Sequence, residues 1–148
     1  MKFKKLIRRI NWYPPLLGMG IRVRKTDDDF RRFEVELRQK WYTRNLFGTH
    51  FGGSLYTMTD PFYVFILTVN LGREYIIWDQ SAKIDFLKPA KGTITGIFEL
   101  DEAKIDEIRA SVEEVGKGAY DFATMLTDES GVDVAKVEKT VYVRRKRR

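Results

Sequence analysis

The stretch of sequence that decides the fold is NLFGTHFGGSLYTMTDPFYVFILTVNLG, from Asn45 to Gly72. It begins with a glycine-rich bend that carries the only histidine, His50, and continues into an almost wholly apolar or hydroxylated run, residues 54–69. A helix that is apolar on every side is typical of a buried helix, and residues 53–70 would form one of roughly 27 Å at about 1.5 Å per residue. We therefore expect a long central helix that ends at Gly72, in the place a C-cap glycine prefers.

One carboxylate, Asp60, lies in the middle of this run. An ionisable group in apolar surroundings costs free energy unless it is paired or used, so Asp60 is a candidate functional residue. The pair Gly52-Gly53 leaves backbone N–H groups accessible at the helix start, where developing negative charge on a carbonyl oxygen is favoured. Two plainer interpretations stay open: Gly-Gly is common in loops, and Asp60 before Pro61 can simply mark a helix kink.

The spacing of these residues requires a second copy of the chain. In a continuous helix Asp60 lies two turns beyond Gly53, roughly 10 Å along the axis. That is too far to serve a carbonyl group bound at the start of the same helix. If two helices pack antiparallel across a two-fold axis, each Asp60 approaches the other chain's Gly52-Gly53, which predicts a homodimer.

The rest of the chain predicts about six strands, because apolar and polar residues alternate in short runs. These runs are residues 20–25, 30–38, 74–87, 93–100, 119–127 and 132–144. An N-cap at Asp101 and apolar residues at three- and four-residue spacing predict a helix over residues 102–114. Strands that follow the central helix with short joins favour a mostly antiparallel sheet with one helix packed on it, which is an α+β fold.

The N-terminal segment predicts a short amphipathic helix over residues 2–11, because its apolar residues recur at helical spacing among lysines and arginines. Pro14-Pro15 is expected to end this helix, and residues 12–19 are expected to form an apolar connector. We predict a single domain over residues 1–148, with residues 1–15 as its N-terminal helix and connector and residues 144–148 as a basic tail.

Composition excludes several classes of site. The chain has 148 residues, no cysteine and one histidine. It therefore has no disulfide, no thiolate site and no multi-histidine metal centre within one chain, so we expect no metal, and the lack of cysteine fits a reducing cytoplasm. No apolar run approaches the ~20 residues that span a bilayer, and the basic N-terminus is not followed by the apolar run of a secretory signal.

The net charge of +6 is concentrated at the two ends. Five basic residues precede position 10 and five form the tail 144–148, so the other 17 face 21 acidic residues and the body carries 17 − 21 = −4. A nucleic-acid binder usually has a basic surface across its fold, so we expect no nucleic-acid partner. The basic ends either aid solubility or attract a polyanion such as a CoA nucleotide, with Arg144, Arg145 and Lys146 near its phosphates, or an acidic lipid surface; membrane contact is not expected.

Two motifs resemble a known family. Asn45, Gly48, Thr49, Gly52-Gly53 and Asp60, at this spacing, resemble the central motif of hotdog-fold acyl-CoA thioesterases of the phenylacetyl-CoA thioesterase type. KIDFLKPAKG, residues 83–92, is similar to the strand-to-turn motif of the same family. The resemblance covers about residues 20–143 and is closest to a branch carried as a domain of unknown function, in which Trp78-Asp79 and residues 137–143 also recur.

The resemblance implies a hotdog fold, in which a long helix is wrapped by a mostly antiparallel sheet. It also implies a homodimer, which can pair further into a tetramer, with its sites at the subunit interface. The carboxylate of Asp60 would act as general base or nucleophile on a thioester, the N–H of Gly53 would polarise its carbonyl group, and Asn45 would orient substrate or water. Gly52, His50 and Phe51 would adjoin the substrate.

This chain departs from the family motif at one position. The family has histidine directly before Gly-Gly, whereas here Phe51 has that position and His50 lies one residue earlier. We expect hydrolysis of an acyl-CoA thioester in the cytoplasm, with no cofactor apart from the CoA of the substrate. The alternative is a non-catalytic hotdog protein that binds acyl-CoA or lipid.

Overall fold

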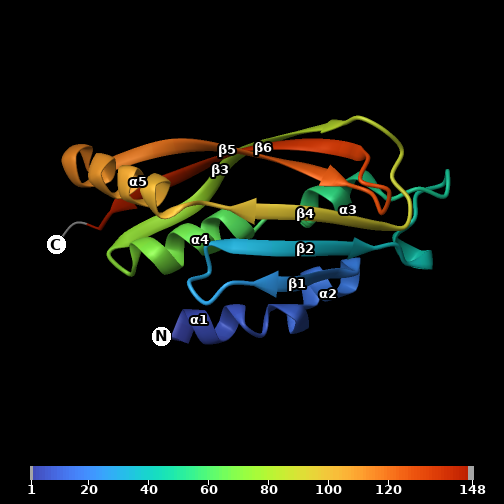
Figure 1. Ribbon diagram of the computed structural model, residues 1–148, viewed down its shortest axis with the longest axis horizontal. Helices are drawn as coiled ribbons and strands as arrows, with labels where there is room; N and C mark the ends of the chain where they lie inside the picture. The colour runs from blue at the N-terminus through green and yellow to red at the C-terminus, as the bar shows by residue number, and fades with distance from the viewer. Residues whose placement is uncertain (1, 147–148) are drawn as a thin grey trace.

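The computed structural model describes residues 2–146, in which helical segments are separated by consecutive pairs of strands (Figure 1). The basic-tail prediction for Arg147 and Arg148 lies outside these residues. The helices are α1 (Lys2–Ile7), η1 (Ile10–Trp12), α2 (Pro14–Met19), η2 (Trp41–Thr43), α3 (Gly52–Thr57), α4 (Phe62–Leu71) and α5 (Glu102–Val115). The strands are β1 (Ile21–Thr26), β2 (Arg32–Arg38), β3 (Tyr75–Phe86), β4 (Thr93–Glu99), β5 (Lys117–Thr127) and β6 (Asp133–Arg145). Each of the six predicted strands is therefore present, within a few residues of its predicted ends.

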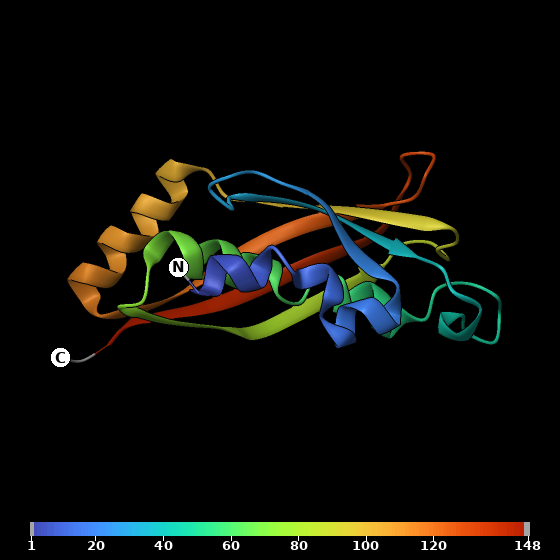
Figure 2. The same ribbon diagram turned by 90° about the horizontal axis from the view of Figure 1, so that it is seen from below.

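The N-terminal segment differs from its prediction. Helix α1 ends at Ile7 rather than at residue 11, and Pro14 begins the helix α2 within the predicted connector. Proline suits the first helical position, where its missing N–H would have no partner in any case. Helix α1 lies along α4, and α2 lies beside α3 (Figure 2). The rings of Phe3 on α1 and Phe65 on α4 meet edge to face at 5.7 Å between centroids.

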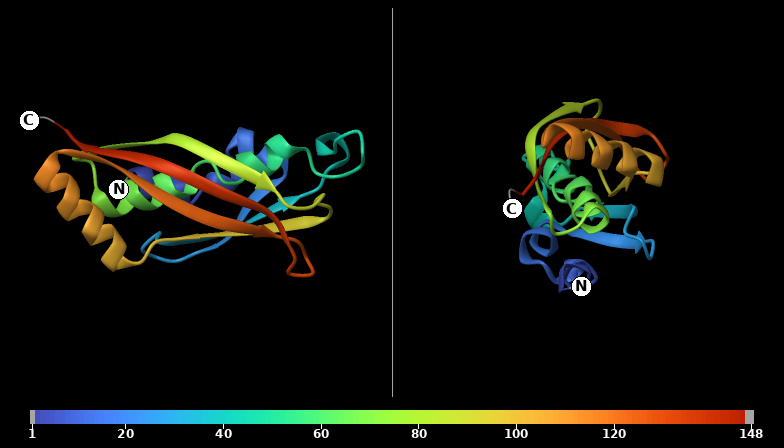
Figure 3. Two further views of the ribbon diagram at one scale, coloured as in Figure 1. Left: turned by 90° about the horizontal axis from the view of Figure 1, so that it is seen from above. Right: turned by 90° about the vertical axis from the view of Figure 1, so that its left-hand side faces the viewer.

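The sheet has the strand order β1-β2-β4-β5-β6-β3, and every neighbouring pair is antiparallel. It curves around α4, with β1 and β3 as its two edges (Figure 3). The predicted α+β class and the antiparallel sheet are thus confirmed. Helix α5 covers one end of the sheet, and the loop that contains η2 lies at the other end (Figure 2).

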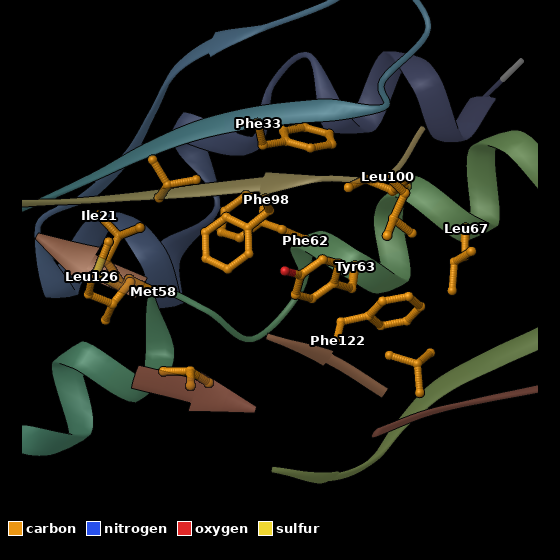
Figure 4. Close-up of a cluster of buried hydrophobic side chains, with 14 of the residues drawn as sticks. Ile21, Phe33, Met58, Phe62, Tyr63, Leu67, Phe98, Leu100, Phe122 and Leu126 are labelled. Carbon is orange, nitrogen blue, oxygen red and sulfur yellow. The ribbon is translucent and has the colours of Figure 1, made fainter. Parts of the chain in front are cut away.

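The core is formed by aromatic rings of α4 packed against the concave face of the sheet (Figure 4). The ring of Phe62 stacks on Phe98 at 5.0 Å between centroids, and Tyr63 stacks on Phe122 at 4.8 Å. Gly96 leaves room in this layer, because a Cβ there would lie 2.8 Å from the side chain of Leu126. Stacked rings in a fully buried layer contribute both apolar burial and specific aromatic contacts, so α4 anchors the fold.

The central helix is not continuous, which corrects the predicted helix over residues 53–70. Helix α3 ends at Thr57 and α4 begins at Phe62. Pro61 causes the break, because it has no N–H to donate and disfavours helical geometry in the residue before it. Asp60 donates its N–H to the carbonyl of Thr57 at 3.2 Å. Asp60 is exposed at this break rather than buried within a helix.

None of the helices between residues 2 and 146 combines the length and the apolar character needed to cross a bilayer.

Candidate functional site

Asp60 lies in a pocket of about 790 Å³ between the N-terminal helices, the start of α4 and the middle of β3. The lining is mostly aliphatic and aromatic, from side chains such as Val64 and Ile77. Its charged side chains are Asp60, Asp79 and Arg9. A pocket of this size, largely apolar with a few polar groups, is typical of a small-molecule site.

The deepest charge near this pocket belongs to Lys139 on β6, whose side chain is fully buried. Its Nζ donates to the carboxylate Oδ2 of Asp79 at 2.6 Å and to the backbone carbonyls of Asp60 at 2.7 Å and Thr59 at 3.2 Å. The same ammonium lies 5.9 Å from the centroid of the Tyr56 ring. One lysine thus connects β3 to the break between α3 and α4.

The two carboxylate oxygens of Asp79 differ in their hydrogen bonding. Oδ2 accepts from Lys139, whereas Oδ1 is buried and has no hydrogen-bond partner among the described residues. Burial raises the pKa of the Asp79 carboxyl, the hydrogen bond and charge of Lys139 oppose this, and the nearby charge of Asp60 raises it further. A perturbed carboxyl group in a pocket beside a second carboxylate is a candidate functional residue.

Asp79 and Lys139 are pocket-side residues that the sequence patterns did not predict. The available signal was the alternation along β6, where Lys139 shares the inward face with Val137, Val141 and Val143. A lysine on a buried strand face requires a partner. The signal for Asp79 was the pair Trp78-Asp79, which is part of the resemblance to the domain of unknown function.

Asn45 shapes the loop before α3. Its Oδ1 accepts from the backbone N–H groups of Phe47 at 2.9 Å and Thr49 at 3.1 Å. Its Nδ2 donates to the hydroxyl of Thr49 at 2.7 Å and to the carbonyl of His50 at 3.3 Å. Both ends of the amide are therefore engaged in holding the turn, a common use of asparagine in loops.

His50 is buried and neutral. Its Nε2 lies 2.7 Å from the carbonyl oxygen of Gly92, which only accepts, so Nε2 carries the proton. Nδ1 is buried without a partner among the described residues, and burial lowers the pKa of the imidazole. His50 thus joins the loop before α3 to the turn between β3 and β4.

Gly52 and Gly53 begin α3 beneath two aromatic rings. A Cβ on Gly53 would lie 2.6 Å from the ring of Phe51, and one on Gly52 would lie 3.0 Å from the ring of Phe86. Phe51 is the N-cap residue and provides no side-chain cap. Within residues 2–146, the backbone N–H groups of Gly52 and Gly53 have no acceptor, so they remain available to a ligand.

The predicted site residues fall into three separate places. Asn45, His50 and Gly52 line a pocket of about 380 Å³ under Phe86, whereas Asp60 lines the larger pocket. The three basic residues line a third pocket, of about 740 Å³, and these are Arg144, Arg145 and Lys146. They begin five residues beyond Lys139 on β6, which is roughly 17 Å along the strand. One chain therefore does not bring Asp60 together with the glycine pair.

Comparisons with known proteins show which family and which fold this architecture resembles. A family model described as Domain of unknown function (DUF4442) matches residues 3–143. No curated protein matches the sequence. A solved structure from Pseudomonas aeruginosa, a protein of unknown function described as a probable thioesterase, is 21% identical and has a TM-score of 0.78, with 88% of this chain and 86% of that chain covered.

Two further structures are similar over almost the whole chain. A putative thioesterase from Shewanella oneidensis is 18% identical with a TM-score of 0.71, and covers 98% of this chain and 99% of its own. The PaaI protein of E. coli, from the phenylacetic acid degradation operon, is 14% identical with a TM-score of 0.64, and covers 99% of this chain and 92% of its own. At these identities the likeness concerns the fold, and it confirms the predicted hotdog fold.

Proposed function

This chain belongs to the DUF4442 family and has the hotdog fold, and from its site we propose that it hydrolyses an acyl-CoA thioester at a site shared by two copies of the chain. The observation that carries the proposal is the position of Asp60. Its carboxylate is exposed at a break in the central helix and lines a largely apolar pocket. A carboxylate placed beside an apolar pocket suits a reaction on the polar head of an otherwise apolar acyl group.

In the proposed mechanism Asp60 either removes a proton from a water molecule that attacks the thioester carbonyl carbon or attacks that carbon itself. In the first case the C–O bond to water forms, the C–S bond breaks, and the CoA thiolate leaves and takes the proton that Asp60 removed. In the second case the carboxylate of Asp60 displaces the thiolate to form a mixed anhydride, which a water molecule then hydrolyses to the free acid and the carboxylate of Asp60. The carbonyl oxygen becomes an oxyanion, for which the free N–H of the partner's Gly53 is a suitable donor. The lack of an acceptor for this N–H within the described part of the chain supports that role.

The long outer edge of the sheet supports a dimer. Strand β3 has 12 residues and pairs with β6 on one side only within the described chain. Large apolar side chains on it, such as Trp78 and Phe86, are exposed. An exposed, long edge strand is a template for pairing with another chain. A second copy on this side would complete the pocket of Asp60.

The substrate in this proposal has an apolar acyl group, because Val64, Phe65 and Ile77 line the pocket beside Asp60. The CoA nucleotide would extend toward the cations of Arg144, Arg145 and Lys146. A cytoplasmic location is part of the same proposal, since a chain without cysteine has no need of an oxidising compartment.

A non-catalytic acyl-CoA-binding protein is the second candidate, and Phe51 is the observation that favours it. Its ring lies against Gly53, in the sequence position where the resembling family has histidine. A ring there narrows the approach to the N–H groups at the start of α3. This candidate predicts saturable acyl-CoA binding without release of thiol.

The test is a panel of acyl-CoA esters with detection of the released thiol, run on the wild type and on Asp60→Asn. We expect hydrolysis by the wild type and a loss of roughly 10²–10⁴-fold in Asp60→Asn, the usual contribution of a general base. The matched control is Asp106→Asn, which removes an exposed carboxylate of α5 that pairs with Arg109. A folded Asp60→Asn protein with the full rate rules out this mechanism, and binding without any turnover favours the second candidate.

A further inference from the structure

Lys139 and Asp79 form a buried charged cluster at the back of the Asp60 pocket. The ammonium of Lys139 has three acceptors, and two of them are the carbonyls of Thr59 and Asp60 at the helix break. The third acceptor, Asp79, lines the pocket together with Asp60. The cluster therefore holds the backbone of one carboxylate residue and the side chain of another in a fixed relation.

A buried cluster of this kind costs folding free energy if its role is only structural. Removing a lysine and an aspartate from water costs several kcal/mol for each ion, and apolar residues of similar volume are often neutral or stabilising in their place. The free Oδ1 of Asp79 adds to this cost, because a buried acceptor without a partner keeps its desolvation penalty. A ligand that donates a hydrogen bond to Oδ1 would remove that penalty.

We propose that Lys139 is a positioning residue for Asp60 and that the free Oδ1 of Asp79 orients the water that attacks the thioester. This inference rests on the proposed hydrolysis. A water molecule has two O–H donors: one faces Asp60, which removes that proton, and the other donates to Asp79. With both donors directed, a lone pair of the water oxygen faces the carbonyl carbon. Asp79 only accepts a hydrogen bond, so no bond changes beyond those of the hydrolysis itself.

The surroundings of Asp79 suit this acceptor role. The charged and titratable groups that face it are Lys139 from β6, Asp60 from the helix break, Tyr56 from α3 and Arg9 from the N-terminal segment. The ammonium of Lys139 favours the ionised form of Asp79 while it occupies only Oδ2. Oδ1 consequently stays buried and without a donor among the described residues, in a side chain that lines the same pocket as Asp60.

The kinetic test compares Asp79→Asn with Asp106→Asn, a control that removes an exposed carboxylate of α5 away from the pocket. In Asp79→Asn the new amide keeps the shape of the side chain and an oxygen for Lys139, but it presents an N–H₂ group in place of Oδ1. We expect kcat to fall about tenfold, the value of one hydrogen bond of about 1.4 kcal/mol, while KM stays close to that of the wild type. Asp106→Asn should leave both constants unchanged. An unchanged kcat in Asp79→Asn overturns the inference.

The second measurement does not need activity. Carboxyl ¹³C NMR follows the titration of Asp79 in the wild type and in Asp60→Asn. We expect the pKa of Asp79 to fall in Asp60→Asn, because the charge of Asp60 contributes to raising it. If the pKa of Asp79 does not change, the two carboxylates do not share a site and the inference fails. If the coupling is present but the wild type hydrolyses no acyl-CoA, the proposed function fails and the role in orienting water fails with it, whereas the shared placement of the two carboxylates stands.

Discussion

The Nζ of Lys139 lies 2.6 Å from Oδ2 of Asp79, and this ion pair joins the middle of β6 to β3. The lysine side chain is fully buried, and that of Asp79 is 20% exposed. The same ammonium donates to two backbone carbonyls at the break between α3 and α4. The ion pair is consequently part of the fold as well as part of the pocket.

Lys139→Met is expected to destabilise the protein strongly. The substitution removes the ammonium but leaves the carboxylate of Asp79 and two carbonyls without their donor. Loss of one partner from a buried pair costs roughly 3–5 kcal/mol of unfolding free energy. Urea unfolding followed by Trp fluorescence measures this loss.

The matched control is Lys136→Met on the same strand. Its side chain is 44% exposed and pairs with Glu138 at the surface, so its removal should cost less than about 0.5 kcal/mol. The double variant Lys139→Met/Asp79→Leu should recover much of the lost stability, because neither charge is then left buried alone. Equal stability of Lys139→Met and Lys136→Met would contradict the geometry described for the ion pair.

His50 is expected to make the fold sensitive to mild acid. Burial holds its pKa below the ordinary value of 6.5, so below pH 6.5 the unfolded chain binds a proton that the folded chain resists. Stability from this group is present above pH 6.5 and falls as the pH decreases toward the folded pKa, with a slope of at most about 1.4 kcal/mol per pH unit. Urea unfolding between pH 7.5 and pH 5 checks the slope.

The control for this prediction is His50→Gln, whose amide keeps a donor for the carbonyl of Gly92 but does not titrate. The acid-sensitive slope should disappear in it. Because the chain has one histidine, proton NMR of the imidazole ring gives its folded pKa without assignment. A measured pKa above 6.5 would show that His50 is not held neutral by burial.

The strands were predictable because a strand with one solvent-facing side and one core-facing side has alternating polar and apolar residues. In β2 the buried Phe33, Val35 and Leu37 alternate with charged residues. The prediction of a continuous central helix was wrong because the apolar run on which it was based extends past Pro61. Hydrophobicity alone does not show where a backbone loses its hydrogen bonds, and Pro61 ended the first segment despite the pattern.

The site was only partly predictable for a different reason. Asn45, His50 and Gly52 lie close together in the sequence and line one pocket, whereas Asp60, predicted to act with Asn45 and Gly53, lines another. The contact of Lys139 with the carbonyl of Thr59 joins residues 80 positions apart and exists because the helix breaks there. A contact between a side chain and freed backbone groups leaves no pattern in the sequence, so this part of the site required the structure.

Gly53→Ala is expected to separate stability from activity. The new Cβ would meet the ring of Phe51 at 2.6 Å, but this ring is 56% exposed and can turn away. Alanine also favours a helix by about 0.5–1 kcal/mol over glycine, so thermal stability should be equal or slightly higher. Hydrolysis should fall by roughly 10²-fold if the N–H of Gly53 serves as the oxyanion donor, because the Cβ and the displaced ring obstruct it.

The control for Gly53→Ala is Gly18→Ala in α2, where a Cβ would meet nothing within 4 Å. It should raise the melting temperature slightly, through the same helix preference of alanine, and leave the rate of thiol release unchanged. A Gly53→Ala protein with full activity would show that no substrate atom approaches this N–H closely.

Self-association through β3 is the prediction on which the shared site depends. We expect sedimentation equilibrium to give a dimer for the wild type, and Trp78→Asp to shift it toward monomer. Trp78 is 44% exposed in the middle of the open edge strand, and a charge at the centre of an interface opposes burial, with typical costs of about 2 kcal/mol or more. Val115→Asp, which places the same charge at the exposed C-terminal end of α5, is the control and should remain dimeric. If Asp60 acts on a group held by the other copy, the rate of thiol release in Trp78→Asp should rise with protein concentration as the dimer re-forms. A wild type that is monomeric at the concentrations at which it hydrolyses acyl-CoA would mean that one chain completes its own site, because Asp60 and Gly53 would then have to meet within it.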